Sequence, residues 1–312
     1  MAIARPRAGR DYPRDWNEFL TLFSSEADCL AYLERVRWGK GFNCVHCGSI
    51  NAPFWRMGDG RRRCKRCRAE TTVTAGTIFH RTRYELRTWF AAIWYVVNAK
   101  NGVSALTVQR TLGMKSYQTA WAWLHKLRRA MVRRDRPSLD GEVEVDESYF
   151  GGAGTGAGRG AQKKAIVAIA VEDHGKGAGR VRMERIPDVT KKTLHGFIKR
   201  NVVPGSIVKT DGWPAYKGLG RLGYKHDVVV QRTSTQSPDE LLPHVHRVAS
   251  LAKRWLLGTH QGSWSPDQLD FYLDEYVFRY NRRRTKNRGM LFYRLIENAV
   301  VTDPHPYREL VA

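Results

Sequence analysis

The chain has 312 residues, enough for roughly two or three domains, and 42% of them are hydrophobic, which argues against wholesale disorder. It carries 53 Lys and Arg against 30 Asp and Glu, and this formal net charge of +23 makes a polyanion the expected partner. No apolar run reaches membrane-spanning length and the N-terminus has no apolar signal core, so we expect a soluble cytoplasmic protein with no membrane partner.

Residues 1–39 are predicted to form an N-terminal helical segment. Ser25 and Asp28 have the spacing of a capping box, and an apolar run follows them. Cys29 stands inside that run, so we expect it to be a core residue.

Residues 40–75 are predicted to form a zinc ribbon around two C-x2-C pairs, which supply Cys44, Cys47, Cys64 and Cys67. Reduced structural cysteines or disulfides are the alternative, and a reducing compartment disfavours the disulfides. Four thiolates leave no open coordination position, so the single Zn²⁺ is expected to be structural. The ribbon is rich in basic residues, and Arg62, Arg63 and Lys65 are candidate DNA contacts.

Residues 76–135 are predicted to form a helical block that resembles a helix-turn-helix. A long apolar helix over 84–100 precedes a short helix over 104–113, and a basic helix begins at Ser116. The groove-facing residues are expected among Gln118, Thr119, Trp123, Lys126, Arg128 and Arg129. An ordinary three-helix bundle with a solvated basic face remains the alternative. A polar, proline-containing linker over 133–141 ends the block.

Residues 141–312 are predicted to form a catalytic domain with a mixed α/β sheet and C-terminal helices. Strands are expected over 143–149, 163–173 and 179–187, followed by a helix over 189–202. A fourth strand begins at 206 and stops at Gly212 and Pro214, a short helix and a strand over 226–231 follow, and helices are expected over 244–257 and 265–281. This order is typical of ribonuclease-H-like folds, so the whole chain is an α+β multidomain protein. The glycine-rich segment 151–162 is expected to be a hairpin loop, either a plain turn or a DNA contact through Arg159, Lys163 and Lys164.

The stretch "GEVEVDESYFGG" places four acids in six residues of a basic chain. In a ribonuclease-H-like sheet the first and fourth strands are neighbours, so Asp146 is expected to meet Asp211. Two adjacent carboxylates repel each other unless a cation lies between them, and Mg²⁺ prefers such oxygen ligands. A surface role for Asp146 is the alternative. We expect Glu142, Glu144 and Glu147 to be solvated or salt-bridged.

The chain resembles the DDE transposases of bacterial insertion sequences, in the ISXO-type branch that has an N-terminal zinc ribbon. The resemblance includes "CVHCGS", "CKRC", "TAGTIFHRTRYELRTWF", "EVDESYFGG", "KTDGWPAY", "KRWLLGTHQG" and "YLDEYVFRYNRR", and extends over nearly the whole chain. It implies that Asp146 and Asp211 are the first two catalytic acids. The position of the third, usually Glu or Asn, falls on His246, which is a departure from the family.

His246 is a poor ligand for Mg²⁺, so Asp239 and Glu240 stay open as substitutes, and Mn²⁺ is the softer alternative ion. Lys253 follows His246 by seven residues, about two helical turns, which places both on one helix face. Lys253 is expected to bind the phosphate beside the cleaved bond, although a surface role is the alternative. The adjacent Arg254 is a candidate DNA contact.

The expected function is metal-dependent cleavage and strand transfer of double-stranded DNA, at the ends of an insertion sequence and at its target. The resemblance implies catalytic Asp146, Asp211, His246 and Lys253, a pair of Mg²⁺ or Mn²⁺ ions, and a bacterial protein associated with the nucleoid. Pairing of two DNA ends implies a homodimer or larger assembly. The alternatives are a non-enzymatic DNA-binding regulator and a nuclease without strand transfer.

Overall fold

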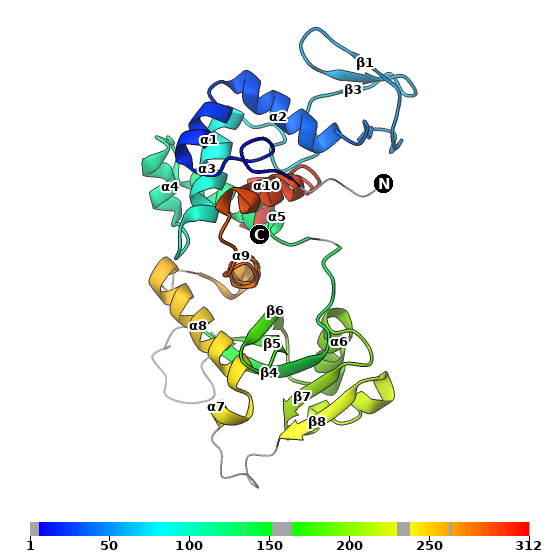
Figure 1. Ribbon diagram of the computed structural model, residues 1–312, viewed down its shortest axis with the longest axis vertical. Coiled ribbons are helices and arrows are strands. Elements are labelled where there is room, and N and C mark those ends of the chain that lie inside the picture. Colours follow the sequence, from blue (N-terminus) through cyan, green and yellow to red (C-terminus); the bar gives the residue numbers. More distant parts are fainter. Residues whose placement is uncertain (1–5, 134, 152–163, 230–237, 262–263, 312) are drawn as a thin grey trace. The chain divides into compact units, whose positions relative to one another are not determined.

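The computed structural model describes residues 6–133, 135–151, 164–229, 238–261 and 264–311. Its contacts divide the chain into two compact units, one of residues 1–133 with 285–312 and one of residues 134–284 (Figure 1). No helix within the described ranges is long and apolar enough to cross a membrane.

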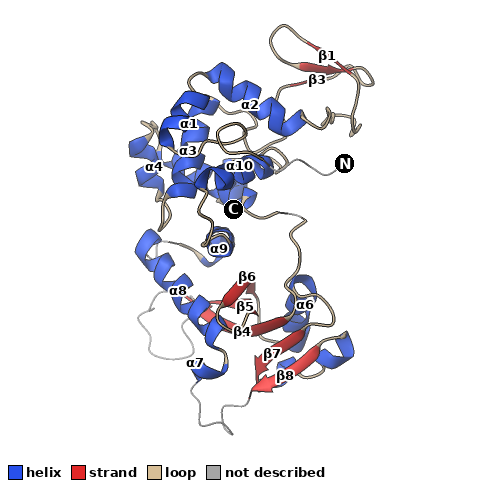
Figure 2. Cartoon of the chain, viewed as in Figure 1, coloured by secondary structure: helices blue, strands red, loops and turns tan. Residues whose placement is uncertain are grey.

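The first unit is mainly helical (Figure 2). Its helices are α1 (Trp16–Leu22), α2 (Glu26–Trp38), α3 (Leu86–Asn98), α4 (Ala105–Thr111), α5 (Tyr117–Ala130), α10 (Arg288–Ala299) and α11 (Tyr307–Leu310). The capping box predicted before α2 is present, because the Ser25 side chain accepts from the backbone N of Asp28 and the Asp28 carboxylate accepts from the backbone N of Ser25. Cys29 is buried, as expected.

The C-terminal helix α10 completes the core of the first unit. Its Phe292 ring is fully buried and lies 5.7 Å from the ring of Phe90 on α3 and 5.8 Å from that of Phe19 on α1. Aromatic pairs at these separations pack favourably. The sequence-based division assigned residues up to 312 to the catalytic domain, whereas the structure groups residues 285–312 with the N-terminal helices.

The zinc-ribbon segment forms a three-stranded antiparallel sheet in the order β1-β2-β3, with β1 (Phe54–Arg56), β2 (Arg62–Cys64) and β3 (Glu70–Thr71). The two C-x2-C pairs occupy matching turns. The backbone N–H of Gly48 donates to the carbonyl of Cys44, and the backbone N–H of Arg68 donates to the carbonyl of Cys64, each at 3.0 Å. Both Gly48 and Arg68 adopt positive φ, so the two C-x2-C turns have the same backbone conformation at this position.

The helices α4 and α5 pack against each other across a short connection. Ser104 and Ser116 are their N-caps, and each side chain accepts from the backbone N–H three residues later. Gly113 lies in the connection with φ of +61°, a conformation that glycine adopts without strain.

The second unit is built on a five-stranded sheet in the order β6-β5-β4-β7-β8. The strands are β4 (Glu142–Phe150), β5 (Ala165–Asp173), β6 (Ala178–Ile186), β7 (Ile207–Asp211) and β8 (Lys225–Val229). The first three are antiparallel, whereas β7 runs parallel to β4 and β8 parallel to β7. The first and fourth strands are therefore neighbours, as the predicted ribonuclease-H-like mixed sheet requires.

Helices cover both faces of this sheet. On one face, α6 (Lys191–Asn201) packs over Val143, Val145 and Val208 together with η1 (Pro214–Tyr216) and η2 (Leu219–Leu222). On the other face, α8 (Pro243–His260) and α9 (Leu269–Asn281) pack over β4, β5 and β6. Figure 1 shows α8 and α6 on opposite sides of the strands. The short α7 (Pro238–Leu241) precedes α8, and η4 (Pro266–Gln268) precedes α9.

Candidate catalytic and zinc sites

The catalytic candidates lie where strand β4 meets helix α8. Successive side chains of a strand point to opposite faces, so Glu144, Asp146 and Ser148 share the face that α8 covers. Val143 and Val145 point the other way, into the core under α6. The alternation in "EVEVDES" therefore separates an apolar core face from a polar face on the α8 side.

Asp146 contacts His246 directly. The Nε2 atom of His246 lies 3.2 Å from Oδ2 of Asp146, and both side chains are partly exposed. Asp211 ends the neighbouring strand β7. The parallel register pairs Glu144 with Lys209, so Asp146 and Asp211 each lie two residues beyond this pair, where β7 ends. The structure thus brings three of the predicted site residues to the carboxyl end of β7.

Electrostatics supports the proximity of the two aspartates. Asp211 is exposed, but the neighbouring protein removes part of the hydration of its carboxyl group and so raises the pKa of that group. The negative charge of Asp146 raises the same pKa further. The backbone N–H of Trp213 donates to Asp211 Oδ1 at 3.0 Å and opposes this rise. Two carboxylates that repel each other are a favourable environment for a cation.

Lys253 lies on the same face of α8 as His246. Its Nζ donates to the hydroxyl of Ser148 at 2.8 Å, and burial lowers its pKa. Contacts of both residues with β4 agree with the two-turn spacing between them. Of the alternative third ligands, Glu240 is exposed on α7, and the side chain of Asp239 lies outside the described residues.

Glu144 has a role that the sequence analysis missed. It is only 1% exposed, and its Oε2 accepts the backbone N–H groups of His244 at 2.9 Å and Val245 at 2.8 Å. A carboxylate at this position satisfies free donors in the first turn of α8 and favours the positive end of the helix dipole. The expected solvated or salt-bridged role for Glu144 is therefore wrong, because this side chain is a buried helix cap.

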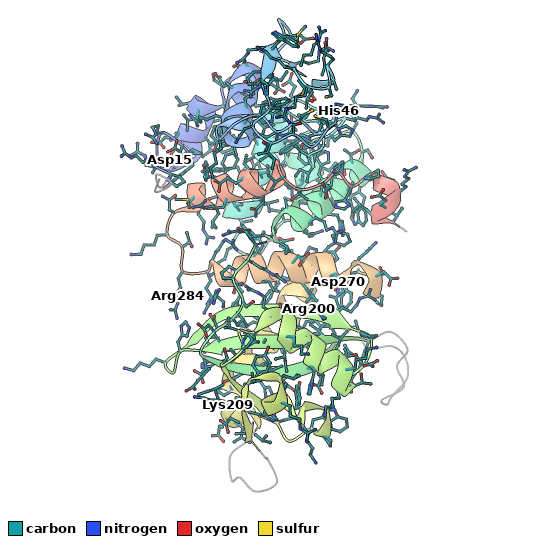
Figure 3. The ribbon with its side chains drawn as sticks, turned by 90° about the vertical axis from the view of Figure 1, so that its right-hand side faces the viewer. Asp15, His46, Arg200, Lys209, Asp270 and Arg284 are labelled. Carbon is teal, nitrogen blue, oxygen red and sulfur yellow. The ribbon has the colours of Figure 1, made fainter. Side chains whose placement is uncertain are left out.

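A second contact secures the same helix turn. Asp173, the last residue of β5, lies 3.1 Å from His244 Nε2 and 3.9 Å from the ammonium of Lys209, which Figure 3 labels on β7. Glu144, Asp173 and His244 each offer a ligand atom within 4.8 Å of the others. Since Lys209 already compensates the Asp173 carboxylate, we interpret this group as a polar network that holds α8.

Glu147 points to the opposite face of β4 and accepts a hydrogen bond from the Tyr216 hydroxyl at 2.7 Å. Burial raises the pKa of Glu147, and the charges of Asp146 and Asp211 raise it further. Its side chain is still partly exposed, and the hydrogen bond with Tyr216 is a contact that the sequence analysis did not predict. The exposed Glu142, at the start of the strand, agrees with a solvated role.

The donor set of Asp146, Asp211 and His246 fits divalent metal ions. Two carboxylates provide hard oxygen ligands, and the imidazole nitrogen adds a softer one that Mn²⁺ accepts more readily than Mg²⁺ does. These three residues are not among the groups of described residues whose ligand atoms all lie within 4.8 Å of one another.

The four ribbon cysteines form a compact group. Cys44 Sγ lies 3.6 Å from Cys67 Sγ, Cys47 Sγ lies 4.0 Å from Cys64 Sγ, and all four sulfurs lie within 4.8 Å of one another. A tetrahedral ion with Zn–S bonds of about 2.3 Å separates its sulfurs by about 3.8 Å. Hydrogen bonds with Ser49 lower the pKa of Cys47, which favours the thiolate that Zn²⁺ binds. The arrangement fits one structural Zn²⁺.

The candidate DNA contacts fall into three groups. Arg129 and Arg254 are exposed, and so are Gln118 and Lys65, so these four side chains present their polar groups to solvent. The guanidinium of Arg62 stacks 4.2 Å from the Trp38 ring centroid and 4.3 Å from that of Phe54, and its side chain is only 11% exposed. Arg63 hydrogen-bonds Glu70. Both arginines therefore make contacts inside the first unit, while Lys126 is half-buried.

Arg128 does not face solvent as predicted, because it is only 2% exposed. It follows the buried Leu124 by four residues on α5 and therefore shares that helix face. Trp123 is 4% exposed, so the sequence-based assignments of Arg128 and Trp123 to the groove-facing set are both corrected. The candidates Arg159 and Lys163 lie outside the described residues, and Lys164 is exposed at the start of β5.

These observations define a protein with a four-cysteine zinc-ribbon unit and a separate ribonuclease-H-like sheet that carries a polar site of two aspartates, a histidine and a lysine. Comparison with known families gives a more specific result. Residues 138–281 match the ISXO2-like transposase domain, and residues 24–70 match the transposase zinc-ribbon domain. The chain therefore contains an ISXO2-like transposase domain and a transposase zinc-ribbon domain, in agreement with the resemblance that the sequence motifs indicated. The first match includes Asp146, Asp211, His246 and Lys253.

One curated relative and several solved structures are similar to the chain. An uncharacterized protein in transposable element ISH50 of Halobacterium salinarum is 26% identical over 280 residues, which cover 82% of this chain and 91% of that protein. The catalytic core domain of BIV integrase covers 48% of this chain and 90% of its own, at 17% identity and a TM-score of 0.33. The Mos1 strand transfer complex covers 70% of this chain and 78% of its own, at 15% identity and a TM-score of 0.30.

Proposed function

We propose that the protein is a metal-dependent DNA transposase that cuts the ends of its insertion sequence and joins them to target DNA. The observation that carries this proposal is the meeting of Asp146 on β4 with His246 on α8, next to Asp211 on β7, inside the region that matches the transposase domain. A purely DNA-binding regulator has no use for an acidic site of this kind in a chain of net charge +23.

In this proposal Asp146, Asp211 and His246 hold two Mg²⁺ or Mn²⁺ ions. When bound, such an ion pair activates an attacking oxygen and stabilises the leaving oxygen of a phosphodiester. Asp146 and Asp211 fix the site on neighbouring strands of the sheet, and His246 adds a ligand from α8. Lys253 supplies a positive charge beside the same site and binds the phosphate next to the cleaved bond as a point charge.

In this proposal, basic surfaces elsewhere in the chain bind the DNA whose phosphodiester is cleaved at this site. The zinc ribbon and α5 bind the terminal repeats, and the exposed Arg254 contributes on α8, one residue beyond Lys253. Since a transposition reaction pairs two DNA ends, the working form is a dimer or a larger assembly on double-stranded DNA. The four cysteines hold one structural Zn²⁺, which maintains the ribbon and takes no part in the chemistry.

The test uses the purified full-length protein, DNA that carries the ends flanking its own gene, and either Mg²⁺ or Mn²⁺. Asp146→Asn and Asp211→Asn should each abolish cleavage while end binding persists, because each removes a metal-binding charge and leaves the basic surfaces intact. Asp227→Asn is the matched control, since Asp227 is an exposed aspartate on β8 outside the site. Near-normal cleavage by either of the first two variants would place the active site elsewhere.

Cleavage and joining are scored separately in the same reactions. Joined products that disappear together with cleavage in Asp146→Asn support a transposase. Cleavage by the wild type with no joined product, in either metal, would favour a nuclease without strand transfer.

A further inference from the structure

The first unit contains a cavity of about 560 Å³ beside the beginning of α5. One wall is formed by the segment 78–84, which belongs to the motif "TIFHRTRYE". The other is formed by α5, through Gln118, Thr119 and Lys126, and Tyr307 of α11 closes one side. Neither the zinc site nor the acidic site uses any of these residues.

The floor of this cavity is aromatic and firmly packed. The rings of Trp89 and Trp123 stack with centroids 3.6 Å apart, and Tyr84 meets Trp123 edge-on at 5.3 Å. The indole N–H of Trp89 donates to the Thr82 hydroxyl at 2.9 Å, which ties the 78–84 segment to α3. The aromatic floor and the wall formed by segment 78–84 are therefore already packed together in this structure.

The segment that leads into this wall is held from the other side by Arg37 of α2. Its guanidinium donates to the carbonyl of Val73 at 2.7 Å and to that of Ala75 at 2.6 Å. Arg81, further along the same segment, adopts φ of +53°, a left-handed conformation that is uncommon for a residue other than glycine. The fold thus maintains an unfavourable backbone conformation at a basic residue on the cavity wall.

The chemistry of the lining is cationic. Arg81, Arg83 and Lys126 line the cavity with His80, and no Asp or Glu occurs among its lining residues, all of which belong to the described ranges. Burial lowers the pKa of Lys126, and burial together with the charges of Arg81 and Lys126 lowers that of His80. An anion in the cavity would offset the repulsion among these groups and favour the charged form of Lys126.

We propose that this cavity binds a phosphate group of the DNA backbone and thereby positions α5 over the neighbouring bases. The inference rests on the proposed function, because it takes α5 as a helix that faces DNA. In helix-turn-helix proteins the residues near the start of the second helix contact base edges, and phosphate contacts fix the register of that helix. Gln118 and Thr119 occupy this position on α5, directly beside the cationic lining.

The backbone of a duplex is a better occupant than a free anion for two reasons. Arginine side chains supply planar forks that suit phosphate oxygens. The cavity is also much larger than one phosphate, so it has room for the sugar and for a contact of the nucleotide with the aromatic floor. Free inorganic phosphate shares the charge and would occupy only part of this volume.

The experiment measures affinity for a fluorescent duplex as a function of salt, with full-length zinc-loaded protein. Lys126→Gln and Arg81→Gln should each make the slope of log affinity against log salt shallower by about 0.9, because each removes one phosphate contact. Between 50 and 200 mM salt this corresponds to a loss of affinity roughly 3-fold smaller than in the wild type. Lys100→Gln is the control, since it removes the same charge from an exposed position outside the cavity.

Single neutral methylphosphonate linkages then locate the contact. One linkage should weaken the wild type, and the same linkage should weaken Lys126→Gln less, since the contact is already lost. Equal slopes for Lys126→Gln, Arg81→Gln and wild type would overturn the proposal. So would inorganic phosphate that binds the wild type but not Lys126→Gln and yet leaves the duplex affinity of the wild type unchanged at constant ionic strength, since this marks a free-anion site that DNA does not use.

These measurements remain informative whatever the catalytic result. A phosphate contact is independent of base sequence, so the slope can be measured on any duplex even if the protein does not cleave its own ends. Zinc content and circular dichroism verify the fold of each variant. If Lys126→Gln fails to fold because Lys126 is half-buried, Arg81→Gln at an exposed position carries the test.

Discussion

Replacement of Glu144 by alanine should release the first turn of α8 from strand β4. In the wild type, Glu144 Oε2 accepts two backbone N–H groups, from His244 and Val245, at 2.9 and 2.8 Å. A buried donor that loses its acceptor costs about 1–3 kcal/mol. Two such donors, with partial hydration of the space left behind, give an expected destabilisation of about 2–4 kcal/mol for local opening of this turn.

Amide hydrogen exchange measures this opening directly, because it reports the stability of individual segments. A change of 2–4 kcal/mol corresponds to exchange roughly 30- to 700-fold faster at His244 and Val245, since every 1.4 kcal/mol is a factor of ten. Glu144→Gln keeps a carbonyl acceptor but loses the charge, so we expect a smaller effect of about 1 kcal/mol.

Glu142→Ala provides the matched control, because Glu142 lies two residues earlier on the same strand face and is exposed. It should leave exchange in α8 unchanged. If the amides of His244 and Val245 exchange as slowly in Glu144→Ala as in Glu142→Ala, then the buried carboxylate does not hold the helix and the reasoning is refuted.

Three further predictions concern the two metal sites and the stability of the second unit. Cys64→Ser should weaken or abolish zinc binding, measured by metal analysis, and full retention of zinc in a variant that lacks all four ribbon cysteines would contradict the site. His246→Ala should lose most cleavage activity, whereas His246→Glu should retain activity with a shift toward Mg²⁺, measured as rates in each metal; wild-type rates for His246→Ala would exclude it as a ligand. Burial raises the pKa of Glu172, but hydrogen bonds from Arg180 outweigh this effect and the net pKa is lowered. Stability from this pair is therefore present above the unfolded pKa of about 4.5 and lost as pH falls through the folded value, so urea unfolding of Glu172→Gln should show a flatter acid dependence, and an unchanged one would contradict the assignment.

Much of the catalytic unit could be predicted because its signals are local. Alternating acids and valines indicated a strand with one polar face, and the seven-residue spacing of His246 and Lys253 indicated one helix face. Both relations appear in the structure as contacts with β4, between His246 and Asp146 and between Lys253 and Ser148. The ribbon could be predicted equally well, since a C-x2-C pair defines a tight turn whatever surrounds it.

Other features depend on tertiary contacts that no local pattern specifies. Phe292 lies on an apolar helix stripe, but only the folded chain shows that this stripe packs among N-terminal aromatic rings. Arg128 is basic in a basic helix, and its burial follows from which side of α5 faces the core. Glu144 and Asp146 look alike in the sequence. The first is buried under the first turn of α8, whereas the second is partly exposed beyond that turn, a difference set by where the helix begins.

The acidic strand thus has two tasks that the chain combines in one stretch. Glu144 holds the start of α8, Asp146 contacts His246 one step further, and Ser148 contacts Lys253 beyond it. Three alternate residues of β4 therefore fix three successive points of the helix that carries the third ligand and the phosphate-binding lysine of the proposed site. A ligand supplied by a helix is only as well placed as the helix itself, and small misplacements of catalytic groups reduce rates strongly. The unusual histidine at this position is consequently held by the same strand that supplies the first aspartate, so its effect on metal preference can be tested by substitution without dismantling the helix that presents it.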